Sequence, residues 1–127
     1  MEKKAPRPTD AELAILRVLW DRGPSTVREV HEALRDTQDS GYTTVLKLMQ
    51  IMTDKGLVDR DASNRAHVYT SRYGQDRTQH QLLRDLADRA FGGSPARLVM
   101  HALSSAKASA EEMKAIRRLL DQMEKKA

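Results

Sequence analysis

The sequence contains no cysteine, and only 4% of its 127 residues are aromatic. Without cysteine the chain can have no disulfide, no thiolate zinc site, no iron–sulfur cluster and no cysteine nucleophile. Its four histidines are scattered, with no pair at the helical spacing of metal ligands, so we expect no metal and no cofactor. Apolar runs are only a few residues long and the N-terminal MEKKAPRPTD has no hydrophobic section, so we expect neither a membrane span nor a signal peptide, and a cytoplasmic protein.

The net charge of the chain is only weak evidence for a polyanion partner. The net charge is +4 and the pI is near 9.6. Residues 1–72 contain 12 Lys and Arg against 11 Asp and Glu, and residues 73–127 contain 10 against 7. If nucleic acid is bound, a few well-placed cations must therefore bind it, rather than a broad positive field.

The first half of the chain predicts three short helices. The first two begin at capping-box spacings, in which a threonine and a glutamate three residues later satisfy each other's backbone N–H groups. The expected elements are a flexible arm at 1–8, a helix from Thr9 or Asp10 through Arg22, a short helix from Thr26 to about Asp36 and a third helix at 41–56. A Gly-Pro break and a polar turn separate these helices, and the order is that of a helix-turn-helix.

The third helix, GYTTVLKLMQIMTDKG, has one core face and one polar face. At about 100° per residue, the core face is formed by Val45, Leu48, Met49 and Met52, and the polar face by Thr43, Lys47, Gln50 and Asp54. Short donors and acceptors near the start of such a helix can reach base edges in a DNA major groove. The alternative is an ordinary amphipathic helix with a solvated face.

A β-hairpin is predicted directly after the third helix. LVDRD and HVYTS are rich in valine and partly alternating, and ASNRA between them tolerates a turn. A hairpin in this position makes a winged helix, and the tip residues Asn64 and Arg65 would then lie near the DNA backbone or the minor groove. The alternative is a solvated hairpin that does not contact DNA.

From residue 74 the pattern is helical to the end of the chain. Three short helices have apolar stripes but little of their own to bury them against, so we expect a homodimer that packs them across a two-fold axis. The alternative is that they fold back over the winged helix. The expected interface consists of Leu83, Leu86, Leu98, Val99, Ile116, Leu120 and Met123. The predicted fold is mainly α with a small β-hairpin, in which a winged helix-turn-helix at 9–73 precedes a helical dimerisation region at 74–127.

Five segments of the chain, in order, resemble a known family. They are PTDAELAILRVLW, GPSTVREVHEAL, YTTVLKLMQIMTDKGLV, RAHVYT and FGGSPARLVMHALSSAKASAEE. They are similar to the penicillinase and methicillin-resistance repressors and their copper-responsive relatives (BlaI, MecI and CopY), over about residues 8 to 123. The resemblance implies a homodimeric transcriptional repressor that binds a palindromic operator. It implies groove contacts from Thr43, Thr44 and Lys47 of the third helix, and wing contacts from Arg65 and His67.

The resemblance extends less well to the inducing signal. In the β-lactam branch of the family a sensor-linked protease cuts an Asn-Phe bond in the dimerisation region, which implies a regulatory protease as a partner. The matching positions here are His101 and Ala102. The copper branch uses a cysteine cluster, and this chain has no cysteine. The architecture is therefore expected to match the family, whereas the inducer is not fixed by the sequence.

The sequence predicts a repressor that binds double-stranded operator DNA, with backbone N–H groups near Thr26 holding a phosphate through the helix dipole. The full set of expected DNA contacts is Thr26, Thr43, Thr44, Lys47, Gln50, Arg65 and His67. The alternative is a winged helix that docks other proteins and does not bind DNA sequence-specifically. We expect no enzymatic activity, because no set of nucleophile, base and orienting group is visible.

Overall fold

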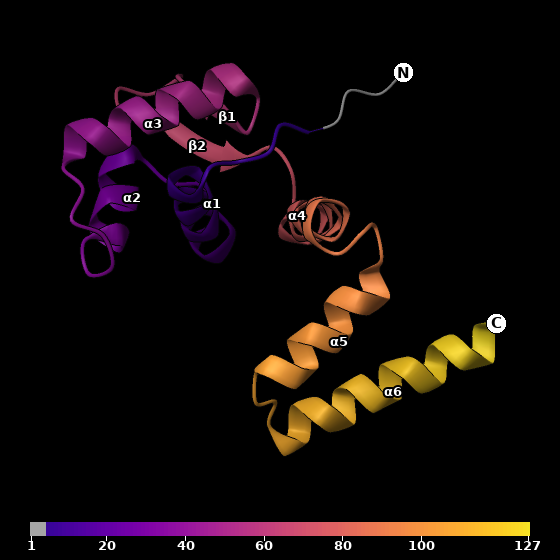
Figure 1. Ribbon diagram of the computed structural model, residues 1–127. Coiled ribbons are helices and arrows are strands. Elements are labelled where there is room, and N and C mark those ends of the chain that lie inside the picture. The colour runs from indigo at the N-terminus through magenta and orange to yellow at the C-terminus, as the bar shows by residue number, and fades with distance from the viewer. Residues whose placement is uncertain (1–4) are drawn as a thin grey trace. The chain divides into compact units, whose positions relative to one another are not determined.

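The structure is a computed structural model that describes residues 5–127, which form six helices and one two-stranded sheet (Figure 1). The elements are α1 (Asp10–Arg22), α2 (Val27–Leu34), α3 (Tyr42–Lys55), β1 (Val58–Asp61), β2 (Val68–Ser71), α4 (Gln75–Ala90), α5 (Pro95–Ser105) and α6 (Ala110–Lys126). The chain divides into two compact units between Leu82 and Leu83, within α4. Of the predicted arm at 1–8, residues 1–4 lie outside the described part of the chain, and Pro8 is buried.

The three helices of the first unit begin and end where local signals in the sequence place them. Both predicted capping boxes form, Thr9 with Glu12 at the start of α1 and Thr26 with Glu29 at the start of α2. At the C-terminal end of α3, Gly56 has a φ of 83°, a left-handed conformation that favours glycine. Its N–H donates to the Met52 and Thr53 carbonyls. The predicted helices are confirmed, although α2 ends two residues earlier than expected.

One aliphatic core holds α1, α2, α3 and the hairpin together. Its buried members are Ile15, Leu16, Leu19, Val27, Val30, Leu34, Val45, Met49, Met52, Leu57, Val58 and Tyr69. Leu48, expected in this core, is only partly buried, because it lies at the edge of the α3 face that Met49 and Met52 bury. The opposite face of α3 is therefore left to solvent.

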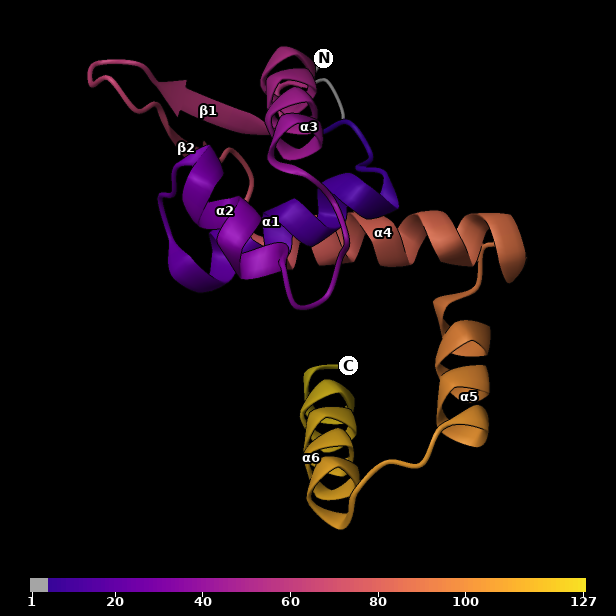
Figure 2. The ribbon, with the colours of Figure 1, turned by 90° about the vertical axis from the view of Figure 1, so that its left-hand side faces the viewer.

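The hairpin is attached to the helices by its second strand. β1 and β2 are antiparallel, in register from Val58 opposite Ser71 to Asp61 opposite Val68. Tyr69 of β2 also pairs with Ser25 in the turn between α1 and α2, through backbone N–H to carbonyl bonds of 2.8 and 3.1 Å. Figure 2 shows the loop between the strands projecting beyond α1, α2 and α3. The winged helix-turn-helix expected from the sequence is confirmed.

The second unit is helical and exposes much of its apolar surface. Gly92 and Gly93, with φ of 60° and 80°, follow α4, and Ser94 caps α5 ahead of Pro95. Ser109 and Glu112 form a capping box at the start of α6. Large apolar side chains that remain exposed in this unit are Leu83, Leu86, Val99, Met100, Leu103, Leu119, Leu120 and Met123. Within residues 5–127, none of the helices has both the length and the apolar character needed to cross a membrane.

Candidate nucleic-acid interface

The outer face of α3 presents all four residues predicted to contact DNA from this helix. Thr43, Thr44, Lys47 and Gln50 are exposed, while Val45, Met49 and Met52 fix the opposite face in the core. The anion Asp54 is also exposed, but it lies seven residues beyond Lys47, roughly 10 Å further along the helix axis. The face is therefore polar and free of carboxylates over its first two turns.

An ion pair to α1 fixes the C-terminal end of α3. Lys55 donates to both carboxylate oxygens of Glu12, at 3.0 and 2.9 Å, and Glu12 is 1% exposed. Burial raises the pKa of Glu12, but the Thr9 backbone N–H and the Lys55 ammonium outweigh it and bring the pKa below its usual 4.5. Glu12 is thus a buried anion that ties the start of α1 to the end of α3.

A histidine on α2 fixes the N-terminal end of α3. Gly41 at the N-cap has no side chain to cap the helix. Instead, His31 Nε2 donates to the carbonyl of Ser40 at 3.1 Å, and the His31 ring meets the edge of the Tyr42 ring at 6.0 Å between centroids and 88° between planes. The entry into α3 is therefore held by contacts from the neighbouring helix.

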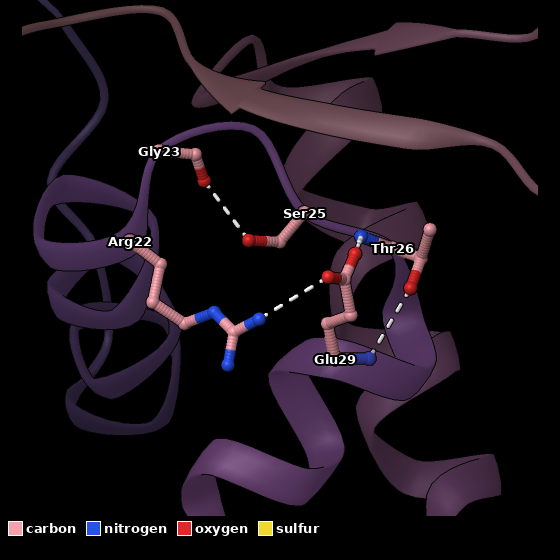
Figure 3. Close-up of polar contacts among 5 residues, drawn as sticks. All are labelled: Arg22, Gly23, Ser25, Thr26 and Glu29. Carbon is pink, nitrogen blue, oxygen red and sulfur yellow. Dashed lines mark hydrogen bonds and ion pairs between the residues drawn. The ribbon is translucent and has the colours of Figure 1, made fainter.

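Two backbone N–H groups at the start of α2, those of Thr26 and Glu29, already have hydrogen-bond partners in the capping box (Figure 3). The Thr26 N–H donates to Glu29 at 2.9 Å, and the Glu29 N–H donates to the Thr26 hydroxyl at 3.2 Å. Hydrogen bonds to the Glu29 carboxylate from the Thr26 backbone N–H and the Thr26 side chain, with a smaller contribution from Arg22 at 3.1 Å, lower the pKa of Glu29. The Thr26 amide is thus occupied, and the amides left for a phosphate are those of Val27 and Arg28, which have no acceptor within the helix.

The turn before α2 is held firmly against the wing. Ser25 is 1% exposed, and its hydroxyl donates to the Gly23 carbonyl at 2.9 Å (Figure 3). Its backbone pairs with Tyr69 of β2 on the other side. The start of α2 and the base of the wing therefore form one framework, in which the distance between them is set by a pair of backbone hydrogen bonds.

This framework, together with the first two turns of α3, borders an open hollow of about 420 Å³, which we call the wing hollow. It is lined by Thr26, Val27, Arg28, Tyr42, Leu46, Arg65, Ala66, His67 and Tyr69. Three predicted contacts, Thr26, Arg65 and His67, are brought together here from two different elements. Arg28 and Tyr42 were not predicted, although an arginine in the first turn of the second helix and a tyrosine directly before Thr43 are signals in the sequence that could have indicated them.

A sequence model of the penicillinase repressor family matches residues 8–122 of this chain. The chain belongs to the penicillinase repressor family. It is 37% identical over 123 residues to the transcriptional regulator BlaI of Mycobacterium tuberculosis, covering 95% of this chain and 88% of that protein. The penicillinase repressor of Bacillus licheniformis is 23% identical, with 94% of each chain covered. The resemblance found in the sequence is thereby confirmed.

Two solved structures match the winged helix of this family member. The solution structure of the DNA-binding domain of the repressor BlaI has a TM-score of 0.52 and 26% identity, over 60% of this chain and 93% of that one. The monomeric form of Bacillus licheniformis BlaI in complex with the blaP half-operator gives the same values. The 60% of this chain that these structures cover corresponds in length to its first unit.

The residues expected at a dimer interface lie in the second unit of this penicillinase repressor family member. Leu83, Leu86, Val99, Leu120 and Met123 are 43 to 59% exposed in the single chain. Leu98 and Ile116 are partly buried. In a single chain, most of these apolar side chains are therefore exposed to solvent.

The positions that match the family's cleavage site lie inside α5. His101 and Ala102 are both exposed, and the His101 ring packs on Phe91 with 5.3 Å between centroids. The Ala102 carbonyl accepts the N–H of Ala106 at 3.2 Å. A protease would have to unwind this part of α5 before it could bind the bond in an extended form.

In the described residues, no three His, Asp or Glu side chains are placed to hold a metal ion.

Proposed function

We propose that this chain is a transcriptional repressor that binds operator DNA through its winged helix and acts as a homodimer. The observation that carries the proposal is the position of the wing hollow beside the exposed face of α3. The hollow is lined by Tyr42 and Leu46, which alternate along α3 with the exposed Thr43 and Lys47. A helix that enters the major groove would therefore have Arg65 and His67 of the wing beside it.

Each contact has a chemical role in this proposal. Thr43 and Thr44 offer hydroxyls and methyl groups to base edges or nearby phosphates, and Lys47 donates to a guanine acceptor or a phosphate. Gln50, one turn further, reaches the groove only at its margin. Arg65 and His67 contact the backbone from the wing, while the amides that follow Thr26 face a phosphate at the positive end of the α2 dipole.

The exposed apolar side chains of the second unit support the proposed dimer. Burial of exposed Leu, Val and Met side chains is favourable by about 25 cal/mol per Å² of apolar surface. A symmetric dimer would also present two recognition helices to the two halves of a palindrome. In this proposal residues 9–73 form the DNA-binding domain and residues 74–127 the dimerisation region. The target is promoter DNA, so the protein would act in the cytoplasm, as a regulator and not an enzyme, by occupying the promoter.

The proposal is tested by selecting genomic fragments bound by the full chain and measuring the affinity of variants for the selected palindrome. Lys47→Ala is expected to weaken binding by about 1–3 kcal/mol if Lys47 contacts a base. Arg65→Ala is expected to weaken binding to all sequences alike and to make the salt dependence shallower by about one unit. Lys107→Ala, which removes an exposed cation outside the winged helix, is the matched control.

Two results would count against the proposal. If Lys47→Ala binds the selected palindrome as tightly as the unmodified chain, Lys47 is not a contact. If the full chain protects no genomic fragment, the winged helix serves the alternative role of docking another protein.

A further inference from the structure

The wing hollow differs in charge from a second, larger concave surface of the first unit. That second surface, between α1, α2 and the start of α4, is lined by both cations and a carboxylate, including Arg17, Arg22 and Asp21. The residues that line the wing hollow include Arg28, Arg65 and His67 but no aspartate or glutamate. An anion in this hollow would therefore meet guanidinium groups without a competing carboxylate in its walls.

The two arginines reach the hollow from separate elements that the fold holds at a fixed spacing. Arg28 is in the first turn of α2 and Arg65 is in the loop between β1 and β2. Both are exposed, and neither forms an ion pair with a described residue. The backbone pairing of Ser25 with Tyr69 sets the distance between their elements. The two guanidinium groups are thus free to bind an external anion.

Tyr42 supplies a third donor to the same hollow. It is 47% exposed, although its ring is held at the edge of His31, which is itself bonded to Ser40. A phenol that is held in place but not buried keeps its hydroxyl available for hydrogen bonding. Tyr42 directly precedes Thr43 in the chain, so the hollow borders the proposed groove-binding face of α3.

We propose that the wing hollow binds one phosphate of the DNA backbone at the edge of the major groove, with Arg28 and Arg65 on two sides and the Tyr42 hydroxyl as a further donor. This inference rests on the proposed function, and it adds Arg28 and Tyr42 to the contact set. Guanidinium groups suit the site because their planar forks bind phosphate oxygens in pairs. The phosphate anchors α2, α3 and the wing at one point, so it fixes the register of α3 in the groove.

The first test compares the affinity and salt dependence of variants for the selected duplex. Arg28→Ala is expected to bind about tenfold more weakly on every sequence, with a salt slope shallower by about one unit. Tyr42→Phe, which keeps the ring against His31, is expected to lose about tenfold, because a hydrogen bond to a charged group is lost. Arg35→Ala removes the same charge from the opposite, exposed end of α2, and should bind like the unmodified chain.

The second test asks whether both arginines hold the same phosphate. Duplexes that carry one uncharged methylphosphonate are scanned along each strand. One position is expected to weaken the unmodified chain most and to weaken Arg28→Ala and Arg65→Ala less, at that same position, because each variant keeps one of the two arginines. A variant with both arginines replaced is expected to be weakened least. Different sensitive positions for the two variants would overturn the shared phosphate.

The outcomes separate this inference from the function on which it rests. If the unmodified chain binds DNA and Lys47→Ala weakens it, but Arg28→Ala matches the unmodified chain in affinity and slope, the phosphate hollow is wrong and the repressor proposal stands. If the unmodified chain binds no duplex, both are wrong.

Discussion

Replacing Lys55 with methionine should destabilise the winged helix without touching its proposed DNA contacts. Lys55 donates to both oxygens of Glu12, whose side chain is 2% exposed, and the Lys55 side chain is 37% exposed. In the variant, Glu12 keeps the Thr9 N–H at 2.8 Å as a partner for Oε1. Its other oxygen loses its hydrogen bond while it remains buried.

The expected cost lies between two limits. Breaking a fully buried ion pair costs about 3–5 kcal/mol, whereas an exposed pair contributes about 0–1 kcal/mol. Since Lys55 is more than a third exposed and Glu12 is buried, we expect Lys55→Met to lower the free energy of unfolding by about 2 kcal/mol. For a unit of this size, that loss lowers the melting temperature by about 10 °C.

Thermal unfolding followed by circular dichroism measures this loss, with Lys47→Met as the control. Lys47 is exposed on the same helix, so its replacement should change the free energy of unfolding by less than about 0.5 kcal/mol while it weakens DNA binding. If Lys55→Met melts at the temperature of the unmodified chain, the ion pair does not stabilise the fold and the reasoning is refuted.

The same variant should also change the response to acid. The pKa of Glu12 in the folded chain lies below its usual 4.5, so the stability that its charge provides is present above about that pH and is lost as the pH falls through the folded-state pKa. In Lys55→Met the ammonium is gone, and burial moves the pKa of Glu12 upward. The difference in stability between the two proteins should therefore shrink below pH 4.5, as Glu12 becomes protonated in both.

Two further predictions concern the end of α3 and the second unit. Gly56→Ala should lower the free energy of unfolding by about 1–2 kcal/mol in urea titrations, because φ is 83° and an added Cβ would lie 2.7 Å from Arg72 Nη1. Gly41→Ala, with open space around its Cβ, should lower the free energy of unfolding by less than half as much. Equal losses in the two variants would contradict the strain argument. Leu120→Glu should shift the sedimentation mass of the full chain from two copies to one at micromolar concentration, whereas Gln122→Glu on the same helix should not; a single-copy mass for the unmodified chain would rule out the dimer.

The sequence by itself determined the helices and the orientation of α3, because the forces that set them act over three or four residues. Capping boxes join residues three apart, and the pair Ser109 and Glu112 could be found in the sequence as surely as in the structure. Glycine at 56 is typical of a left-handed helix end, as the structure has it. The period of apolar residues along α3 predicted that Thr43 and Lys47 would be exposed.

Only the tertiary structure decided which distant residues share a site. Glu12 and Lys55 are 43 residues apart in the chain, and neither carries a local signal for the other. The pairing of Ser25 with Tyr69 brings the wing to the start of α2, and this pairing creates the hollow that Arg28 lines. Periodicity reports which face of an element is buried, but not which element covers it. The partners of a side chain across a core depend on how all the elements pack together, and that is fixed only when the whole unit folds.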